Sequence, residues 1–348
     1  MAVMLPRWER KESAVRSRAF ALIGTLIVIA VVALAPVPTA GQEPTSSKSA
    51  WKAGASSKPF TPKRLHDGQP DIQGIYTNQW VIPIERFSRE ERADFEKAIV
   101  AHRGPNHLAG PGTNGAYGNE WFDRPTGGTD RPDNSPHPPG YVAVTDPPDG
   151  KIPWQPWALA KKTYIRDHPF ETRAIYDYRV RCLPAGTPRG MFFSYYNGWQ
   201  IQQSPGQVVI LYEHNHLYRV IRLDGSPHPG PNIQLWMGDS VGRWEGNTLV
   251  VDVRNFTGKT WVVGDLGGEG MHTGSFHSPA LHVVERFTIV DADAIDYEAT
   301  IEDPNVFTKP WKLGYRVFTR APKDYQLFEY ACHEGNKTIE LMIDVFKR

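Results

Sequence analysis

Residues 281–301 have the sequence LHVVERFTIVDADAIDYEATI, in which apolar and polar residues alternate on both sides of the turn sequence DAD. Successive side chains of a β-strand point to opposite faces, so this period of two predicts strands at Leu281–Val290 and Ala294–Ile301. The short polar segment between them predicts an antiparallel hairpin. One carboxylate, that of Glu285, falls on the apolar face of the first strand.

The same pattern of short alternating segments and turn sequences covers the C-terminal half of the chain. Pro205-Gly206 and Gly246-Asn247 predict hairpin turns. Many consecutive antiparallel strands with few helices form either a sandwich or a closed barrel, and we expect the barrel. The predicted fold class is mainly β, an antiparallel β-barrel of lipocalin-like form. Further strands are expected at residues 199–203, 208–220, 248–253, 311–318 and 325–332.

The N-terminal segment has the composition of a targeting sequence. Five Lys and Arg residues lie within the first eighteen, and a charge-free, mostly apolar run follows at Ala19–Ala35. This layout predicts a signal peptide over residues 1–41, or alternatively an uncleaved membrane anchor. Residues 42–66 are rich in Ser, Lys, Pro and Thr, which is typical of a flexible linker. We therefore expect an exported protein, periplasmic or secreted, that is either released or tethered to the membrane by this segment.

Residues 67–150 are expected to hold one helix and a long irregular wrap, and residues 151–348 are expected to form the barrel domain. Ser88 and Glu91 form a capping-box pattern ahead of an apolar period of three to four residues. This pattern predicts a helix over Arg89–His102. The residues after it are dominated by Gly, Pro, Asn and Asp, which favour irregular structure.

The charge of the chain and its motifs exclude several kinds of partner. Residues 1–41 hold five of the 39 basic and two of the 38 acidic residues, so the remainder is close to neutral and no nucleic-acid partner is expected. Gly238–Gly242 fits the pattern G-x-S-x-G, but a hairpin follows the serine where a nucleophile elbow requires a helix. We expect no cofactor and a small-molecule ligand or substrate.

Cys182 and Cys332 are the two cysteines of the chain. In an exported protein, an even pair of cysteines far apart in the sequence predicts a disulfide. Two separate buried thiols are the alternative. We expect the disulfide.

His214 and His216 stand two residues apart in LYEHNHLYRV, residues 211–220. On one continuous strand they would share a face with Tyr212 and Tyr218 and line a ligand site. A zinc site is the alternative, but the third ligand of a cupin-like motif is missing. We therefore expect no metal, and the candidate ligand-binding residues of this strand are Tyr212, His214 and Tyr218.

Glu285 is costly to bury among apolar neighbours unless it is paired or protonated. Its expected partners are histidines of neighbouring walls, or Arg286 if a bulge redirects that side chain; an outward-facing salt bridge is the alternative. We expect Glu285 and His216 to face one cavity. His282, near the start of the strand, is a further acid–base candidate. The candidate catalytic residues are accordingly His216, His282, Glu285 and Arg286.

Six motifs of the chain are DGQPDIQGIY (67–76), DPPDGKIP (146–153), RCLPAG (181–186), WMGDSVGRWEGNTLVVD (236–252), LHVVERFT (281–288) and EYACHEGN (329–336). In these motifs the chain resembles a large family of uncharacterised exported proteins of environmental bacteria, for which we know of no common activity. This resemblance implies export, a single extended domain and a functional role for His216, Arg219, His282, Glu285 and Arg286, and it adds Arg219 to the candidate ligand-binding residues.

Two functions fit these observations. The first is an exported β-barrel that binds a small apolar or aromatic molecule, as the 11 Trp, 14 Tyr and 15 Phe residues suggest. The alternative is a cofactor-independent lyase, isomerase or hydrolase that uses His and Glu as acid and base in the barrel.

Overall fold

The computed structural model describes residues 60–77, 84–86, 88, 90–91, 142–168, 181–191, 198–263, 275–321, 323, 325–327 and 329–337. The expected signal or anchor segment lies outside the described residues, as does most of the expected irregular wrap. Of the helix expected at Arg89–His102, the described residues include its start, where the amide of Glu91 donates to Ser88 Oγ at 3.1 Å and the amide of Ser88 donates to Glu91 Oε2 at 2.7 Å. These are the two hydrogen bonds of a capping box. Within the described part, no helix is long and apolar enough to cross a membrane.

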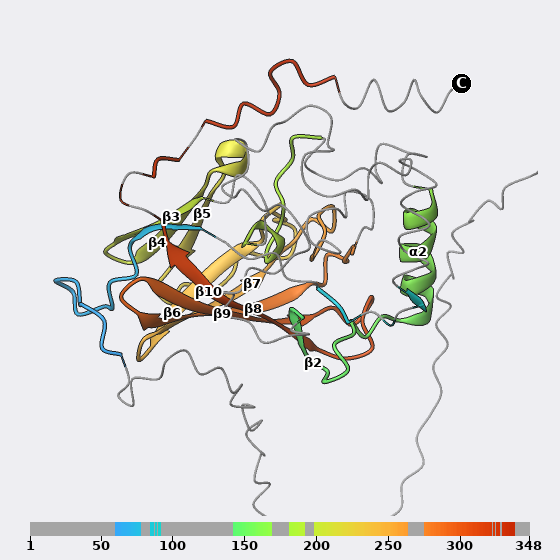
Figure 1. The fold of residues 1–348 in the computed structure, drawn as a ribbon, viewed down its shortest axis with the longest axis horizontal. Coiled ribbons are helices and arrows are strands. Elements are labelled where there is room, and N and C mark those ends of the chain that lie inside the picture. The colour runs from blue at the N-terminus through green and yellow to red at the C-terminus, as the bar shows by residue number, and fades with distance from the viewer. Residues whose placement is uncertain are drawn as a thin grey trace, which may run out of the picture. The chain divides into compact units, whose positions relative to one another are not determined.

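Nine strands of the described chain form a closed β-barrel (Figure 1). β1 pairs with both β3 and β10, and these two pairings close the ring. β2 (Val144–Asp146) pairs with the other end of β10. The expected β-barrel is thus confirmed. Its strands in spatial order are β1 (Gly74–Thr77), β3 (Trp199–Ser204), β4 (Gln207–Tyr212), β5 (Tyr218–Arg222), β6 (Asp239–Glu245), β7 (Thr248–Arg254), β8 (His282–Asp291), β9 (Ala294–Glu302) and β10 (Trp311–Arg320).

The expectation of a purely antiparallel barrel is wrong at one pairing. β5 and β6 run parallel, with Ile221 opposite Ser240, whereas the other described pairings are antiparallel. Parallel neighbours cannot be joined by a tight hairpin, and here residues 223–238 provide the crossover. This segment contains three prolines, which favour a long irregular connection over a turn.

The three hairpins predicted from turn sequences are present. β3 and β4 are joined at Pro205-Gly206, β6 and β7 at Gly246-Asn247, and β8 and β9 at Ala292-Asp293. Gly206 and Gly246 have φ angles of 80° and 63°, a region that residues with a Cβ rarely adopt. The glycines therefore explain why the chain reverses at these two places.

One side of each strand is buried in the barrel, as the alternation of the sequence predicts. In β8 the buried side carries Val283, Glu285, Phe287 and Ile289, and in β9 it carries residues 295, 297, 299 and 301. The apolar members of these sets belong to the main hydrophobic core. Burying them stabilises the fold and fixes the register, because a slip by one residue would expose the whole set.

Two segments differ from the expected domain layout. β1 belongs to the barrel although it precedes the expected domain start at residue 151, and Phe60, in the expected linker, packs against the core. The strand expected at residues 325–332 is absent from the described residues there, which form no ladder. Instead Tyr325 and Tyr330 bind the turn after β4, through contacts that sequence periodicity does not reveal.

The helix α2 (Pro156–Asp167) lies between β2 and β3 in the chain and was not predicted. Pro156 occupies its first position, where the missing N–H costs nothing. Gln155, the residue before its start, holds it to the connection between β9 and β10, since the Gln155 amide donates to Val306 O at 2.8 Å. Trp157 and Leu159 are 52% and 50% exposed on this helix.

Candidate functional site

A buried ion pair lies inside the barrel between Arg219 of β5 and Glu285 of β8. The exposed fractions of the two residues are 3% and 0%. Arg219 Nη2 donates to Glu285 Oε2, and Tyr297 Oη of β9 donates to Glu285 Oε1 at 2.7 Å. Arg219 Nε donates to Ser240 Oγ of β6 at 2.8 Å. Four strands therefore contribute to one polar cluster in an otherwise apolar interior, and we call Arg219, Ser240, Glu285 and Tyr297 the inner cluster.

The inner cluster holds one full positive and one full negative charge. Burial would lower the pKa of Arg219, but the nearby Glu285 carboxylate outweighs burial and raises it above its ordinary value. Burial, together with the Glu285 charge, raises the pKa of Tyr297 well above 10.0. Arg219 therefore stays cationic and Tyr297 stays a neutral hydrogen-bond donor at physiological pH.

Tyr212, the last residue of β4, lies next to this cluster. Burial raises its pKa to about 12, and the charge of Arg219 acts on it in the opposite direction. Its hydroxyl donates to Met191 Sδ at 3.5 Å. Tyr212 is buried, and so is Arg219, the fourth candidate ligand-binding residue; that they bind a ligand stays a prediction.

Several buried donors lack a hydrogen bond to any described residue, and two of them lie at the same end of the barrel interior. Nη1 of Arg219 lacks a hydrogen bond, and so does Nε1 of Trp199 in β3, whose residue is 2% exposed. Trp199 stands opposite Tyr212 in the strand register, so both donors belong to the same end of the β3–β5 sheet. Leaving a buried donor without an acceptor costs about 1–3 kcal/mol. Such donors are uncommon in native proteins and require an explanation.

Aromatic rings surround the inner cluster on the β8, β9 and β10 side. The Phe287 and Tyr297 rings meet edge to face at 4.9 Å between centroids, and Tyr297 contacts Phe318 at 5.4 Å. Phe318 in turn meets the edge of Trp199 at 4.8 Å, and Trp199 stacks on Tyr76 at 5.3 Å. The interior is therefore lined by large, rigid apolar surfaces with few polar atoms, which is the composition of small-molecule sites.

The prediction that His214 and His216 lie on one strand is wrong. β4 ends at Tyr212, and His214–His216 forms a 3-10 turn, η4, in which Asn215 and His216 have φ angles of 60° and 50°. The turn shifts the alternation of inward and outward side chains by one residue. In β4 the even-numbered residues point inward, whereas in β5 the odd-numbered residues do. This shift brings Arg219 inside the barrel and leaves Tyr218 69% exposed outside it.

His216 and Glu285 do not face one cavity, contrary to the sequence prediction. His216 Nε2 accepts a hydrogen bond from the Tyr330 amide at 2.9 Å, and His214 stacks on the Tyr330 ring at 4.6 Å between centroids. The preceding residue, Glu213, is buried and accepts from Tyr325 Oη at 2.7 Å. The turn therefore binds the C-terminal segment, and Glu285 finds its partners in Arg219 and Tyr297 instead.

Arg286 and His282 lie on the outer face of β8. Arg286 Nη2 pairs with Glu245 Oε2 at 3.0 Å, and its side chain is 39% exposed. His282 Nε2 bonds to Asp252 Oδ2 at 2.8 Å. Neighbouring residues of a strand point to opposite faces, so neither side chain reaches Glu285 unless the strand bulges between them, and here the pairing with β7 is regular.

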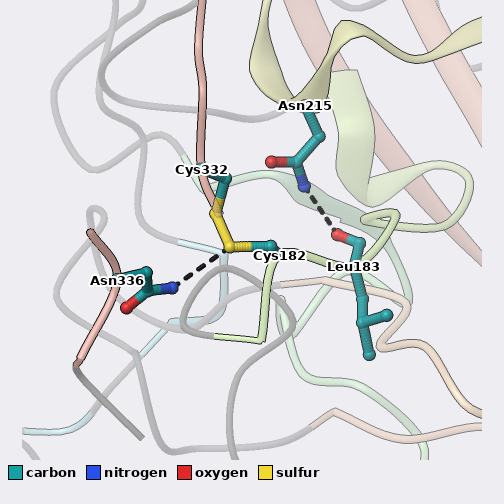
Figure 2. The surroundings of a disulfide bond; sticks show 5 residues. All are labelled: Cys182, Leu183, Asn215, Cys332 and Asn336. Carbon is teal, nitrogen blue, oxygen red and sulfur yellow. Dashed lines mark hydrogen bonds between the residues drawn. A yellow bond between two sulfur atoms is a disulfide. The ribbon is translucent and has the colours of Figure 1, made fainter. Parts of the chain in front are cut away.

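The disulfide between Cys182 and Cys332 is present, as predicted. Figure 2 shows its surroundings: Asn215 of the η4 turn donates to Leu183 O at 2.9 Å, and Asn336 Nδ2 donates to Cys182 Sγ at 3.1 Å. The disulfide and the turn thus hold the segment around residue 182 and the C-terminal segment at one place. A structural disulfide of this kind is typical of an oxidising compartment.

A second polar network covers the outer face of β6, β7 and β8. His228 Nδ1 contacts Asp239 Oδ2 at 2.6 Å, and its Nε2 contacts Asp252 Oδ1 at 2.9 Å. Asp252 also bonds to His282, and Asp239 receives two hydrogen bonds from Arg222 at 2.7 and 3.0 Å. His228 belongs to the β5–β6 crossover, so the network fixes that connection to the barrel wall.

Asp252 at the centre of this network gives folding a pH dependence. Burial would raise its pKa, but hydrogen bonds and charges from His282 and Arg254 outweigh burial and hold the pKa well below 3.8. Because the folded pKa is the lower one, the stabilisation is complete above pH 4 and is lost as the pH falls through the folded value. We expect Asp252→Asn to lower the free energy of unfolding by about 1 kcal/mol at pH 7, the upper range for partly exposed ion pairs.

Urea denaturation at pH 7 and pH 3 measures this effect. The difference between Asp252→Asn and the parent protein should shrink at the lower pH. Glu302→Gln is the matched control, because its carboxylate is 52% exposed and 3.7 Å from His282. If the difference in unfolding free energy between Asp252→Asn and the parent is larger at pH 3 than at pH 7, the assigned pKa direction is contradicted.

Among the described residues, no group of three or more His, Cys, Asp or Glu side chains is arranged to hold a metal ion. No family model matches the chain, and neither a curated protein nor a solved structure matches it significantly. The class that the fold and site define is a closed mixed β-barrel with a buried arginine–glutamate pair in an aromatic interior.

Proposed function

We propose that this protein is an exported β-barrel that binds a small apolar or aromatic molecule inside the barrel, in a lipocalin-like manner. The observation that carries the proposal is the guanidinium of Arg219, which is buried among aromatic rings and has Nη1 without a partner in the described chain. A ligand that supplies the missing acceptor would remove this cost. The disulfide and the N-terminal apolar segment support export.

The alternative, a lyase, isomerase or hydrolase that uses His and Glu as acid and base, has less support. Both oxygens of Glu285 already accept hydrogen bonds, from Arg219 and Tyr297, and none of the described contacts of Glu285 involves a histidine. Burial lowers the pKa of His277, whose ring is held by Thr260 Oγ1 at 2.7 Å and Ser278 O at 2.8 Å. A general base needs a lone pair within reach of its substrate, and the contacts of His277 engage both of its ring nitrogens.

Titration with N-phenyl-1-naphthylamine, an uncharged apolar fluorescent probe, tests the binding function. We expect a saturable change in probe and tryptophan fluorescence at about one probe per chain, because closed barrels of about eight strands have room for one small ligand at most.

Two variants locate the bound probe. Ala299 is fully buried directly opposite Glu285 in the register, so Ala299→Leu should occupy interior space and weaken binding about tenfold or more, at a stability cost of about 1–3 kcal/mol. Trp157→Ala, on the exposed face of α2, should leave binding unchanged. The proposal fails if no apolar probe saturates, or if Trp157→Ala abolishes binding while Ala299→Leu does not.

A further inference from the structure

We infer that the ligand is an uncharged apolar molecule with a hydrogen-bond acceptor, such as a ketone, ester or amide, and that this acceptor binds Nη1 of Arg219. The inference rests on the proposed binding function and adds the chemical class of the ligand. It follows from the charge balance of the inner cluster and from the hydrogen-bonding capacity that the cluster leaves unused.

The charges of the interior are already balanced. Arg219 and Glu285 are the charged residues among the described inward-facing positions of the strands, and they pair with each other. A ligand carboxylate would add a second negative charge to a desolvated site with one cation, and an ionised group without a counter-charge is strongly disfavoured there. A ligand cation would compete with Arg219 for Glu285, whose two oxygens are both engaged.

The hydrogen-bonding groups that the inner cluster leaves without a partner are donors. Three nitrogens of the Arg219 guanidinium face the interior, of which Nε binds Ser240, Nη2 binds Glu285 and Nη1 has no partner in the described chain. Trp199 Nε1 is a second such donor, opposite Tyr212 in the register. A pure hydrocarbon would leave these donors unsatisfied, whereas a neutral oxygen acceptor satisfies one without adding charge.

Three probes with the same ring system separate these cases: naphthalene, 2-acetylnaphthalene and 2-naphthoate, titrated at pH 7.5 against the full chain. We expect the methyl ketone to bind about tenfold or more tightly than the hydrocarbon, the discrimination that one buried hydrogen bond provides, and more tightly than the carboxylate. Infrared spectroscopy of the bound ketone should show its carbonyl stretch at lower frequency than in hexane, because a charged donor polarises the carbonyl.

Arg219→Lys tests the assignment of the atom. Lysine keeps the charge beside Glu285 but lacks the planar guanidinium group. The ratio of the dissociation constants of naphthalene and 2-acetylnaphthalene should therefore fall toward one. Arg286→Lys, the same substitution on the outer face of β8, should retain the preference. If Arg219→Lys does not fold, the probe series and the infrared shift of the parent protein still decide the question.

The outcomes distinguish the two claims. Naphthalene binding as tightly as the ketone would overturn the inference, since a retained water would then satisfy Nη1. Tightest binding of the carboxylate would also overturn it, since the site would then prefer an anion. Either result leaves the binding function standing, whereas no saturable binding of any of the three probes overturns both.

Discussion

Replacing Glu285 with alanine is expected to lower the free energy of unfolding by about 3–5 kcal/mol, because it leaves the buried Arg219 charge without its counter-ion. Arg219 is 3% exposed, so water cannot solvate the guanidinium unless the barrel opens. Tyr297 loses an acceptor in the same substitution, which adds to the cost. Urea denaturation followed by tryptophan fluorescence and circular dichroism measures the change.

Two further variants show whether the charge itself is responsible. Arg286→Ala changes the next residue of β8, which is on the outer face, and should cost no more than about 1 kcal/mol. In the double variant Arg219→Met/Glu285→Leu both charges are removed, and the stability should return toward that of the parent, since apolar replacements of a buried pair are often neutral. A small effect of Glu285→Ala, similar to that of Arg286→Ala, would place Glu285 in contact with water.

Removing the disulfide is expected to have an effect of similar size. In the chain-entropy model, a bond between residues 150 apart in the sequence stabilises the folded state by about 5 kcal/mol, because it restricts the unfolded chain. The double variant Cys182→Ser/Cys332→Ser should therefore unfold at a much lower urea concentration. The two serine hydroxyls form no covalent bond with each other, so they do not restrict the unfolded chain.

Intact-mass measurement after alkylation without reductant provides the control for this prediction. The native protein should gain no alkyl group, and after reduction under denaturing conditions it should gain two. Alkylation of two thiols in the native protein would contradict the bond. Equal stability of the native protein and the double serine variant would contradict the proposed contribution of the loop.

Strict alternation predicted the parts of the fold where neighbouring residues decide the conformation. The apolar period around Glu285 correctly placed this carboxylate inside the barrel, and the turn sequences located three hairpins. The period around Tyr297 carried the same signal, since this residue shares its face with three apolar neighbours in β9. The sequence thus contained enough information to expect two polar groups of the inner cluster in one hairpin.

The partner of Glu285 could not be predicted in the same way, because a turn interrupts the alternation between Tyr212 and Arg219. Two consecutive residues with positive φ, Asn215 and His216, reverse the inward side, and their conformation depends on contacts with Leu183 and Tyr330 far away in the sequence. An Asn in such a position is a weak signal of left-handed backbone. Periodicity alone therefore could not show that Arg219 faces the barrel interior.

The outer network and the parallel pairing escaped prediction for a related reason. His228 lies in a proline-containing crossover, and its carboxylate partners Asp239 and Asp252 are brought to it by the pairing of β5 with β6 and β6 with β7. Tertiary contacts of this kind leave no local pattern in the sequence. Asp239 and Ser240 fall within a G-x-S-x-G pattern, and in the structure Ser240 accepts a hydrogen bond from Arg219.

A crystal structure of the protein with bound 2-acetylnaphthalene tests the central claim most directly. The account predicts the ring system inside the barrel among Tyr212, Phe287 and Phe318, with the carbonyl oxygen about 2.7–3.2 Å from Arg219 Nη1, the ordinary range of such a hydrogen bond. Density for the probe against the exposed Trp157 and Leu159 of α2, and none inside the barrel, would contradict the account.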